Sequence, residues 1–329
     1  MCRRCLQTSG EAGRLILVDA MALLYRAHFG FGQMRLANAA GEDTSVTYGL
    51  IGTLLNLLEL VPPPTHLAIV FDAAGKTFRH ELYSGYKGQR PPMPPELAQA
   101  VPRVRKVLRV LGLAELRVPG VEADDVIGTV ATRAVDAGFH VAIVSPDKDF
   151  YQLLRPGLQL LRPPKRSAAA QATVGGLVPY NADAFVAEFA VQPSQWADVL
   201  ALSGDAADNV PGVAGVGPKT ALALLQRFGD LEGVLGGAGE VTRKKPREEL
   251  SSDSGVAAAR LSKRLVSIRT DLDLPPLRFD WGELRLREPD EASRTAIAET
   301  FAALQFVQHA RRLDLVWASL FPRPHASLR

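Results

Sequence analysis

Nine acidic residues between positions 19 and 208 stand where predicted strands end or loops begin. They are Asp19, Asp72, Glu122, Asp124, Asp125, Asp147, Asp149, Asp205 and Asp208. The carboxyl ends of strands in an open parallel α/β sheet meet at one crevice, so we expect these side chains to converge. Carboxylates brought together resist ionisation, and Mg²⁺ or Mn²⁺ relieves that repulsion in oxygen-rich sites. The acids therefore predict a two-metal site of the kind that cleaves phosphodiesters.

Each acid also has an ordinary structural explanation when it is taken alone. An Asp after a strand commonly caps the next helix. Glu122 and Asp125 are three residues apart, and the helix dipole favours negative charge in a first turn. What favours the metal site is the coincidence: every recognisable strand end carries an acid, and two of them frame Lys148.

A glycine-rich segment at residues 212–220 precedes a helical pattern. Closely spaced glycines before a helix expose N–H groups that bind phosphate. A Walker A loop needs a contiguous Gly-Lys-Thr after a strand, and Pro218 interrupts that order. We therefore expect a helix–hairpin–helix that grips the DNA backbone, with a plain αα-turn as the alternative. The candidate DNA contacts are Gly212, Gly215, Gly217, Lys219 and Thr220.

Basic and aromatic residues alternate between Lys76 and Arg90. Such a segment suits single-stranded nucleic acid, because cations follow phosphates and rings stack on bases; a solvated charged face is the alternative. It has little apolar periodicity, so we expect it to be poorly ordered without DNA. Arg26, shortly after Asp19, is a further candidate for contact with the scissile phosphate, or else it only covers apolar surface.

The elements that must position these residues alternate between strands and helices. Strands are predicted at 15–18, 67–71 and 140–144, and helices at 20–29, 49–60, 97–111 and 122–137. This order predicts an α/β fold with a mostly parallel sheet. We divide the chain into a flexible terminus (1–13), a nuclease core (14–180), a small helical domain (181–290) and a tail (291–329). We further expect a mobile loop at 163–176 in the core, a charged insertion at 233–254 in the helical domain and a helix at about 294–310 in the tail.

Composition restricts the remaining possibilities. Hydrophobic residues make up 47% of the 329 residues and charged residues 22%, which is typical of globular domains. The net charge of +3, with many acids gathered in one site, leaves a basic surface that suits a polyanion. Cys2 and Cys5 lack the second pair that a zinc site needs, and no disulfide framework is expected. The expected compartment is reducing, and no apolar run is long enough for a membrane span.

Several motifs resemble those of the 5′-nuclease family, in order, from Arg14 to about Leu313. They include Val70-Phe-Asp72, Phe78-Arg-His-Glu81, Tyr86-Lys-Gly-Gln-Arg90, Glu122-Ala-Asp-Asp125, Ser145-Pro-Asp-Lys-Asp149 and Gly204-Asp-Ala-Ala-Asp208. The amino-terminal 5′→3′ exonuclease domain of bacterial DNA polymerase I is the most similar form, with its stand-alone relatives in bacteria, phages and plant or algal organelles.

The resemblance implies a PIN-like nuclease core, a helical arch at 76–95 and a helix-three-turn-helix domain. It implies a first metal cluster of Asp19, Asp72, Glu122, Asp124 and Asp125 and a second of Asp147, Asp149, Asp205 and Asp208. Two Mg²⁺ ions, with Mn²⁺ as a substitute, are the expected cofactors, and a K⁺ ion at the hairpin is a further expectation that Ala207, in place of a common serine, weakens. The arch residues Arg79, Tyr86, Lys87 and Arg90 are the expected catalytic side chains, with Lys87 nearest the scissile phosphate.

The implied activity is 5′→3′ exonuclease and 5′-flap endonuclease cleavage of DNA and RNA primers, in replication and repair. No polymerase segment follows, so a separate DNA polymerase is the expected partner of a monomeric nuclease in a bacterial cytoplasm or an organelle. Two alternatives stay open. An idle DNA-junction binder would lack some of the acids, and a PIN-type ribonuclease would usually lack the hairpin domain.

Overall fold

The computed structural model describes residues 12–32, 34–164, 173, 175–274 and 280–322. The predicted flexible terminus, except for residues 12 and 13, lies outside these ranges, as does most of the predicted loop at 163–176.

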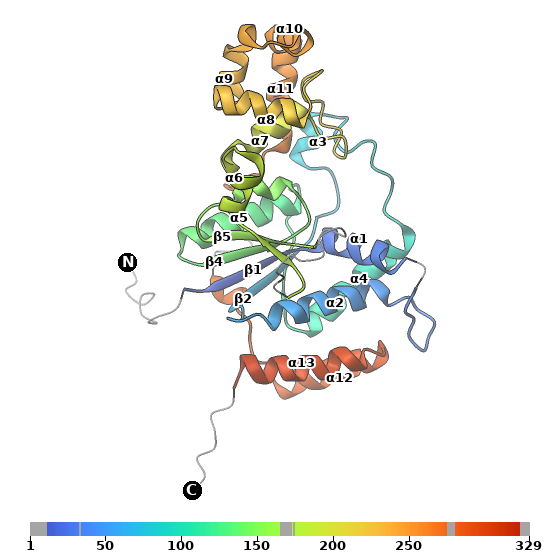
Figure 1. Cartoon of the computed structure of the whole chain (residues 1–329). Coiled ribbons are helices and arrows are strands. Elements are labelled where there is room, and N and C mark those ends of the chain that lie inside the picture. Colours follow the sequence, from blue (N-terminus) through green and yellow to red (C-terminus); the bar gives the residue numbers. More distant parts are fainter. Residues whose placement is uncertain (1–11, 33, 165–172, 174, 275–279, 323–329) are drawn as a thin grey trace.

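A six-stranded sheet forms the centre of the molecule, in the strand order β3-β2-β1-β4-β5-β6 (Figure 1). Neighbouring strands are parallel except for β5 and β6, which confirms the mostly parallel sheet. Three of the strands were not predicted, two of them because only three residues leave no visible apolar pattern. The strands are β1 (Arg14–Asp19), β2 (His66–Val70), β3 (Ala114–Leu116), β4 (His140–Val144), β5 (Leu158–Arg162) and β6 (Val178–Tyr180).

The alternation of side chains along β1 supplies both faces of the sheet. Ile16 and Val18 belong to a core shared with α1 (Ala20–Phe31), α2 (Ser45–Leu58) and α4 (Pro95–Val110). Leu15 and Leu17 belong to a second core, which contains α5 (Ala123–Asp136). Successive strand residues point to opposite faces, so one apolar run serves both layers. The four predicted helices are confirmed, although α2 begins four residues before its predicted start.

The second core continues without a break into the helical domain above the sheet (Figure 1). The predicted charged insertion at 233–254 is mostly helical, since it includes most of α9, all of α10 and the start of α11. Asp230 and Ser252 cap helices in this stretch through their side chains. The helices are α6 (Ala182–Phe189), α7 (Trp196–Ser203), α8 (Pro218–Phe228), α9 (Leu231–Gly236), α10 (Lys244–Ser251) and α11 (Asp253–Val266).

The segment from Lys76 to Arg90 differs from the expectation of a disordered arch. It contains the short helix α3 (Phe78–Leu82), and the side chains of Arg79 and Tyr86 are only 2% and 4% exposed. Sequence periodicity did not show this packing, because the buried groups are polar side chains satisfied by distant partners.

Two helices, not one, end the described chain: α12 (Glu291–Ala303) and α13 (Val307–Leu320). Gln305 adopts a left-handed conformation between them, and Phe306 turns back into the core beside α2. Both helices pack below the sheet (Figure 1). No helix in the described ranges is long and apolar enough to cross a bilayer.

Candidate active site

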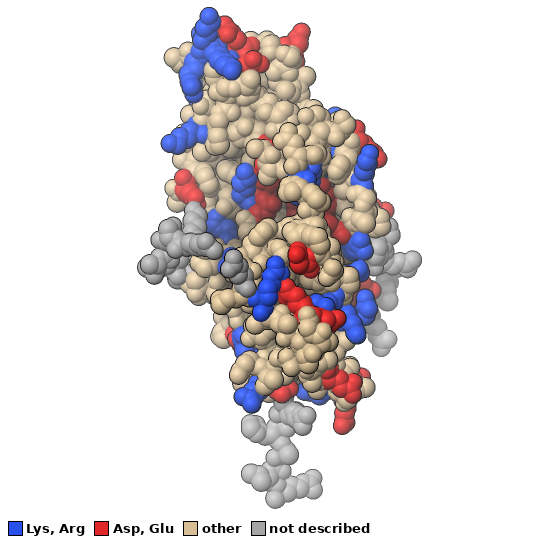
Figure 2. All heavy atoms as spheres, turned by 90° about the vertical axis from the view of Figure 1, so that its right-hand side faces the viewer, with Lys and Arg blue, Asp and Glu red and all other residues tan. Residues whose placement is uncertain are grey.

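A cleft of about 550 Å³ opens beyond the carboxyl ends of β1, β2 and β4. Figure 2 shows acidic side chains set back in a hollow of this face, with basic side chains beside them. A second hollow, of about 590 Å³, lies at the opposite ends of β1 and β4 and is lined by none of the nine acids. The cleft is lined by Asp19, Asp72, Asp124, Asp147 and Asp208 together with Lys87, Arg90, Arg105 and Arg117.

Asp19 ends β1 and caps α1, so its backbone position follows from the strand-to-helix turn. Its carboxylate accepts hydrogen bonds from Ala22 N at 3.2 Å and from Ser145 Oγ at 2.7 Å. Burial raises the pKa of Asp19 to about 6 against these two hydrogen bonds, and the charges of Asp147 and Asp72 raise it further. A cation bound beside Asp19 would lower that pKa again, because it favours the charged form.

The crowding of negative charge that acts on Asp19 also acts on Asp124, Asp147 and Asp149. Burial raises the pKa of each, and neighbouring acids add to it: Asp19 and Asp147 for Asp124, and Asp147 and Asp205 for Asp149. Oδ1 of Asp149 is buried and has no hydrogen-bond partner among the described residues. A buried acceptor with no donor is costly, and a metal ion at this point would satisfy it.

A second part of the cleft is neutralised by the segment 76–90. Lys87 Nζ lies 2.9 Å from Glu122 Oε1 and 3.8 Å from Asp208 Oδ2. The Tyr86 hydroxyl lies 3.1 Å from Glu122 and 3.0 Å from Asp208, so its single proton can be donated to either acid, and Arg90 forms an ion pair with Asp208. Burial acts to lower the pKa of Lys87, but Glu122 and Asp208 outweigh it and raise that pKa. Lys87 is therefore a fixed positive charge at the cleft.

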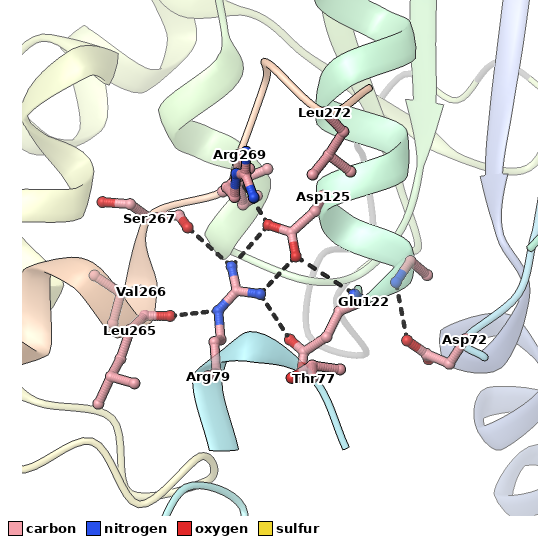
Figure 3. Close-up of polar contacts among 12 residues, drawn as sticks. Asp72, Thr77, Arg79, Glu122, Asp125, Leu265, Val266, Ser267, Arg269 and Leu272 are labelled. Carbon is pink, nitrogen blue, oxygen red and sulfur yellow. Dashed lines mark hydrogen bonds and ion pairs between the residues drawn. The ribbon is translucent and has the colours of Figure 1, made fainter. Parts of the chain in front are cut away.

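Asp125 does not share the environment of the other acids (Figure 3). It is fully buried, and both its oxygens accept hydrogen bonds from Arg79, at 2.6 Å and 2.8 Å. Arg269 N donates a further bond to it at 2.9 Å. These donors occupy the carboxylate in this structure, so the expected role of Asp125 as a metal ligand stays a prediction that its surroundings do not favour. Arg79 is buried and does not line the cleft, so its expected action on substrate likewise stays a prediction without support from this geometry.

The two remaining acids lie on loops. Asp72, which is exposed, follows β2 and accepts a hydrogen bond from Ala123 N at 2.9 Å. Asp205 lies before the hairpin and is 3.3 Å from Lys148 Nζ. Asp72 therefore stays accessible from the cleft, whereas Asp205 is partly neutralised.

The structure brings two unpredicted arginines to the cleft and leaves a second predicted arginine, after Arg79, outside it. Arg105 lies on α4, and Arg117 follows β3 and donates to Asp72 O at 3.1 Å. Arg26 instead lines a separate hollow of about 220 Å³ between α1 and α2, so its contact with the scissile phosphate stays a prediction that this placement does not favour. Proximity along the chain misplaced Arg26, and only the order of the strands shows the other two.

The nine acids do not form a ready-made metal site. Within the described ranges, no three His, Cys, Asp or Glu side chains are grouped so that they could hold a metal ion. The acids without a basic side chain as partner repel one another. The others form ion pairs with Lys87, Arg90, Arg79 or Lys148. The chemistry of the donors nevertheless fits divalent cations, because carboxylates line the cleft and the unpartnered Asp149 Oδ1 belongs to a residue that Asp147 of the cleft crowds.

The hairpin between α7 and α8 places its candidate contacts at the surface. Gly217 and Lys219 are exposed, and a side chain added at Gly217 would meet nothing within 4 Å. Gly212 is different, because its φ is 62° and an added Cβ would lie 2.3 Å from Gly204 N. Gly212 therefore shapes the hairpin, while Gly217 leaves its surface open.

Gly215 and Thr220 connect the hairpin to the region around α10. Gly215 has a φ of 81°, and an added Cβ would lie 3.1 Å from the Lys245 side chain. Thr220 Oγ1 accepts a hydrogen bond from Arg243 at 3.1 Å. Lys245 thus stands beside Gly215 and Arg243 beside Thr220, a proximity that spacing along the chain did not reveal.

Comparison with known proteins agrees with this architecture. Residues 14–205 match the family model of the 5'-3' exonuclease N-terminal resolvase-like domain, and residues 191–292 match that of the 5'-3' exonuclease C-terminal SAM fold. A flap endonuclease of bacteriophage T5, solved with DNA and metal ions, has a similar fold. Its TM-score is 0.60 at 16% identity, over 92% of this chain and 99% of that one.

Two curated relatives are similar in sequence. The 5'-3' exonuclease of Aquifex aeolicus is 34% identical over 276 residues, which are 84% of this chain and 88% of the relative. DNA polymerase I of Bacillus caldotenax is 33% identical over 295 residues, which are 90% of this chain but 32% of that protein. This chain thus spans about a third of the polymerase. The match to both domain models and to a relative along nearly its whole length shows that the chain belongs to the 5'-3' exonuclease family of nucleases.

Proposed function

We propose that this chain is a divalent-metal-dependent 5′→3′ exonuclease and 5′-flap endonuclease. Its substrates would be DNA with free 5′ ends, 5′ flaps and RNA primers, in replication and repair. The observation that carries the proposal is the cleft in which Asp19, Asp124 and Asp147, whose pKa values are raised by burial and by neighbouring acids, lie beside Lys87 and Arg90. A site of this composition combines metal ligands with cations that stabilise developing negative charge.

Eight of the nine acids remain as proposed ligands. When bound, two Mg²⁺ ions, or Mn²⁺ in their place, would supply an activated water and charge stabilisation at the phosphate. Oδ1 of Asp149 would turn from an unsatisfied acceptor into a ligand. The proposed ligands are Asp19, Asp72, Glu122, Asp124, Asp147, Asp149, Asp205 and Asp208.

The segment 76–90 would hold the reacting phosphate. Lys87 and Arg90 line the cleft, so phosphate oxygens can replace Glu122 and Asp208 as their partners. Burial raises the pKa of Tyr86, and both of these acids raise it further, so its hydroxyl remains a donor. Tyr86 would therefore hold Glu122 and Asp208 in place while the lysine moves toward substrate.

The hairpin at 212–220 would hold duplex DNA next to the cleft. Asp205 and Asp208 precede it directly in the chain, so a strand gripped there is presented to the acids. The exposed Lys219 and the open surface at Gly217 suit phosphate contact. A K⁺ ion on hairpin carbonyls, a monomeric state and a separate polymerase as partner stay predictions.

One experiment separates this proposal from its alternatives. A duplex carrying a 5′-labelled flap is incubated with the protein in Mg²⁺ or Mn²⁺, with EDTA as the control, next to a single-stranded RNA of equal length. We expect flap cleavage that requires the metal. Binding without cleavage would indicate a junction binder, and cleavage of only the RNA would indicate a ribonuclease.

A further inference from the structure

The chain leaves the helical domain through a short connection that runs along the nuclease core. We call residues 265–272 the linker; it begins at the end of α11 and passes the first turns of α5 (Figure 3). The helical domain and the core therefore meet here through backbone, in addition to their shared apolar core.

Arg79 joins the linker to the acids. Its Nε donates to Leu265 O at 2.7 Å and its Nη2 to Ser267 O at 2.8 Å. The same guanidinium holds both oxygens of Asp125 and lies 3.3 Å from Glu122 Oε2. One planar group with five donors thus fixes α3, the linker and the first turn of α5 in a single geometry.

Further contacts make the linker rigid against the two helical turns that carry acids. Gln152, in the 3-10 helix η1 (Asp149–Leu153), donates to Val266 O and accepts from Ile268 N, both at 3.0 Å. A side chain at Gly128 on α5 would lie 2.4 Å from Ile268, so the linker fits closely there. A movement of the linker must therefore move the starts of α5 and η1.

We propose that Arg79 is a positioning residue that couples the grip of the helical domain on duplex DNA to the arrangement of the cleft carboxylates. The inference rests on the proposed nuclease function and adds the way in which duplex binding and cleavage are linked. A displaced linker moves Asp125 through Arg79 and Arg269 N, and Asp125 lies in the same helical turn as Asp124. Arg79 itself is buried and does not line the cleft.

The test uses the full chain with Arg79→Lys, which keeps the charge but loses the bidentate fork. Arg133→Lys is the matched control, because Arg133 lies on α5 and donates to the linker at Leu272 O, at 2.7 Å, away from Asp125. Single-turnover cleavage and Kd are measured on a flap with a long duplex and on a single strand too short to reach the hairpin.

For Arg79→Lys we expect cleavage of the long-duplex flap to fall by roughly 10–100-fold, as when an outer partner of a site is lost. Kd should change by less than about threefold, and the short strand should lose much less activity. Gly217→Val should also reduce cleavage by a smaller factor in the Arg79→Lys protein than in the unmodified protein. The reason is that a change at the hairpin no longer affects the cleft once the two sites are uncoupled. Equal losses on both substrates, or equal losses in the Arg133→Lys control, would overturn the coupling.

A readout independent of cleavage separates this inference from the proposed function. Amide hydrogen exchange at residues 122–128 and 265–272 is compared with and without duplex DNA, in EDTA. Slower exchange in both stretches, lost in Arg79→Lys and kept in Arg133→Lys, supports the coupling even for a protein that cleaves nothing. If duplex DNA does not change the exchange rate at residues 122–128 in the unmodified protein, the coupling is wrong. Should Arg79→Lys fail to fold, Gln152→Met frees the linker from η1 and must show the same loss in weaker form.

Discussion

Asp125 and Asp149 lie at the first turns of neighbouring helical elements, yet their surroundings are opposite. Asp125 accepts hydrogen bonds from the guanidinium of Arg79 and from a backbone amide. Asp149 is crowded by Asp147, Asp205 and other acids, and its Oδ1 has no partner in the described structure. A buried acid that is satisfied by the chain serves the fold, whereas one left unsatisfied is available to a ligand.

The largest effect that this comparison predicts is on catalysis at Asp149. Asp149→Asn should lower metal-dependent cleavage by more than the roughly 10–100-fold typical of a lost outer-shell partner. Its melting temperature in EDTA should stay or rise, because a repulsive charge leaves the cleft. Single-turnover cleavage with Mg²⁺ and a thermal melt check both parts. Near-normal cleavage would remove Asp149 from the ligand set.

Asp125→Asn should show the reverse pattern, with its main effect on stability. Breaking a buried ion pair from one side typically costs about 3–5 kcal/mol, because the remaining charge is left without its partner. Urea unfolding monitored by circular dichroism measures the loss. If the variant is as stable as the unmodified protein but needs much more Mn²⁺ for cleavage, Asp125 is a ligand after all.

Lys87→Ala tests the neutralised part of the cleft. A cation that faces the reacting phosphoryl oxygens contributes on the order of 2–4 kcal/mol in the transition state, while one phosphate contact among many adds little affinity. We expect a corresponding fall in the single-turnover rate and a small change in Kd, measured at one salt concentration. Weaker binding with a normal rate for bound substrate would make Lys87 a docking residue.

Gly217→Val contrasts the hairpin with the cleft and should have a smaller effect. The added side chain meets nothing in the protein, so it should leave folding intact and obstruct only an approaching phosphate. KM for duplex-containing substrates should rise more than kcat falls. Gly239→Val, at another exposed glycine with open space, is the control. An equal loss on short single strands would show that Gly217 only shapes the turn.

The smallest effect concerns pH. The pKa of Asp19 rises from 3.8 to about 6 on folding, so the folded chain binds that proton more tightly than the unfolded chain. Its contribution to stability therefore falls as pH rises through this interval and is least favourable above it. His66 and His309 act oppositely, since burial lowers the pKa of each.

Comparison with Asp19→Asn separates the contribution of the Asp19 carboxyl to the pH dependence of stability from that of these histidines. Melting temperatures at pH 5 and pH 7.5, in EDTA, are compared between this variant and the unmodified protein. When the pH falls from 7.5 to 5, the melting temperature of the unmodified protein should rise more, or fall less, than that of Asp19→Asn. An identical pH dependence in both proteins would show that Asp19 ionises normally in the folded chain.

The sequence was sufficient for the parallel strands β1, β2 and β4 and for most of the cleft, for a local reason. Asp19 directly follows the apolar run at 15–18, and Asp72 directly follows the one at 67–71. Parallel strands bring such positions to one edge of the sheet. The use of Asp125 was not predictable in this way. Its partner Arg79 is 46 residues away, and Arg269 is 144 residues away, in a segment without a motif.

The basic side chains show the same limit. Lys87 and Arg90 were expected near the acids, and the structure places both in the cleft. Arg105 and Arg117 reach it only because β3 lies at the edge of the sheet beside β2, an order that no local pattern reports. Arg26 was misplaced because a helix turned it away from the end of its own strand.

The sheet order also bears on the order in which a growing chain can assemble. β1 pairs with β4, which begins at His140, and the bond from Arg79 to Leu265 spans 186 residues. Contacts so distant along the chain are formed late and slowly. During synthesis the first strand can pair with β2 early, but its other edge stays unpaired until β4 has emerged. Asp125 acquires its full set of donors only once residue 269 has emerged. A nascent chain carries the acids of the cleft well before it can hold them in place.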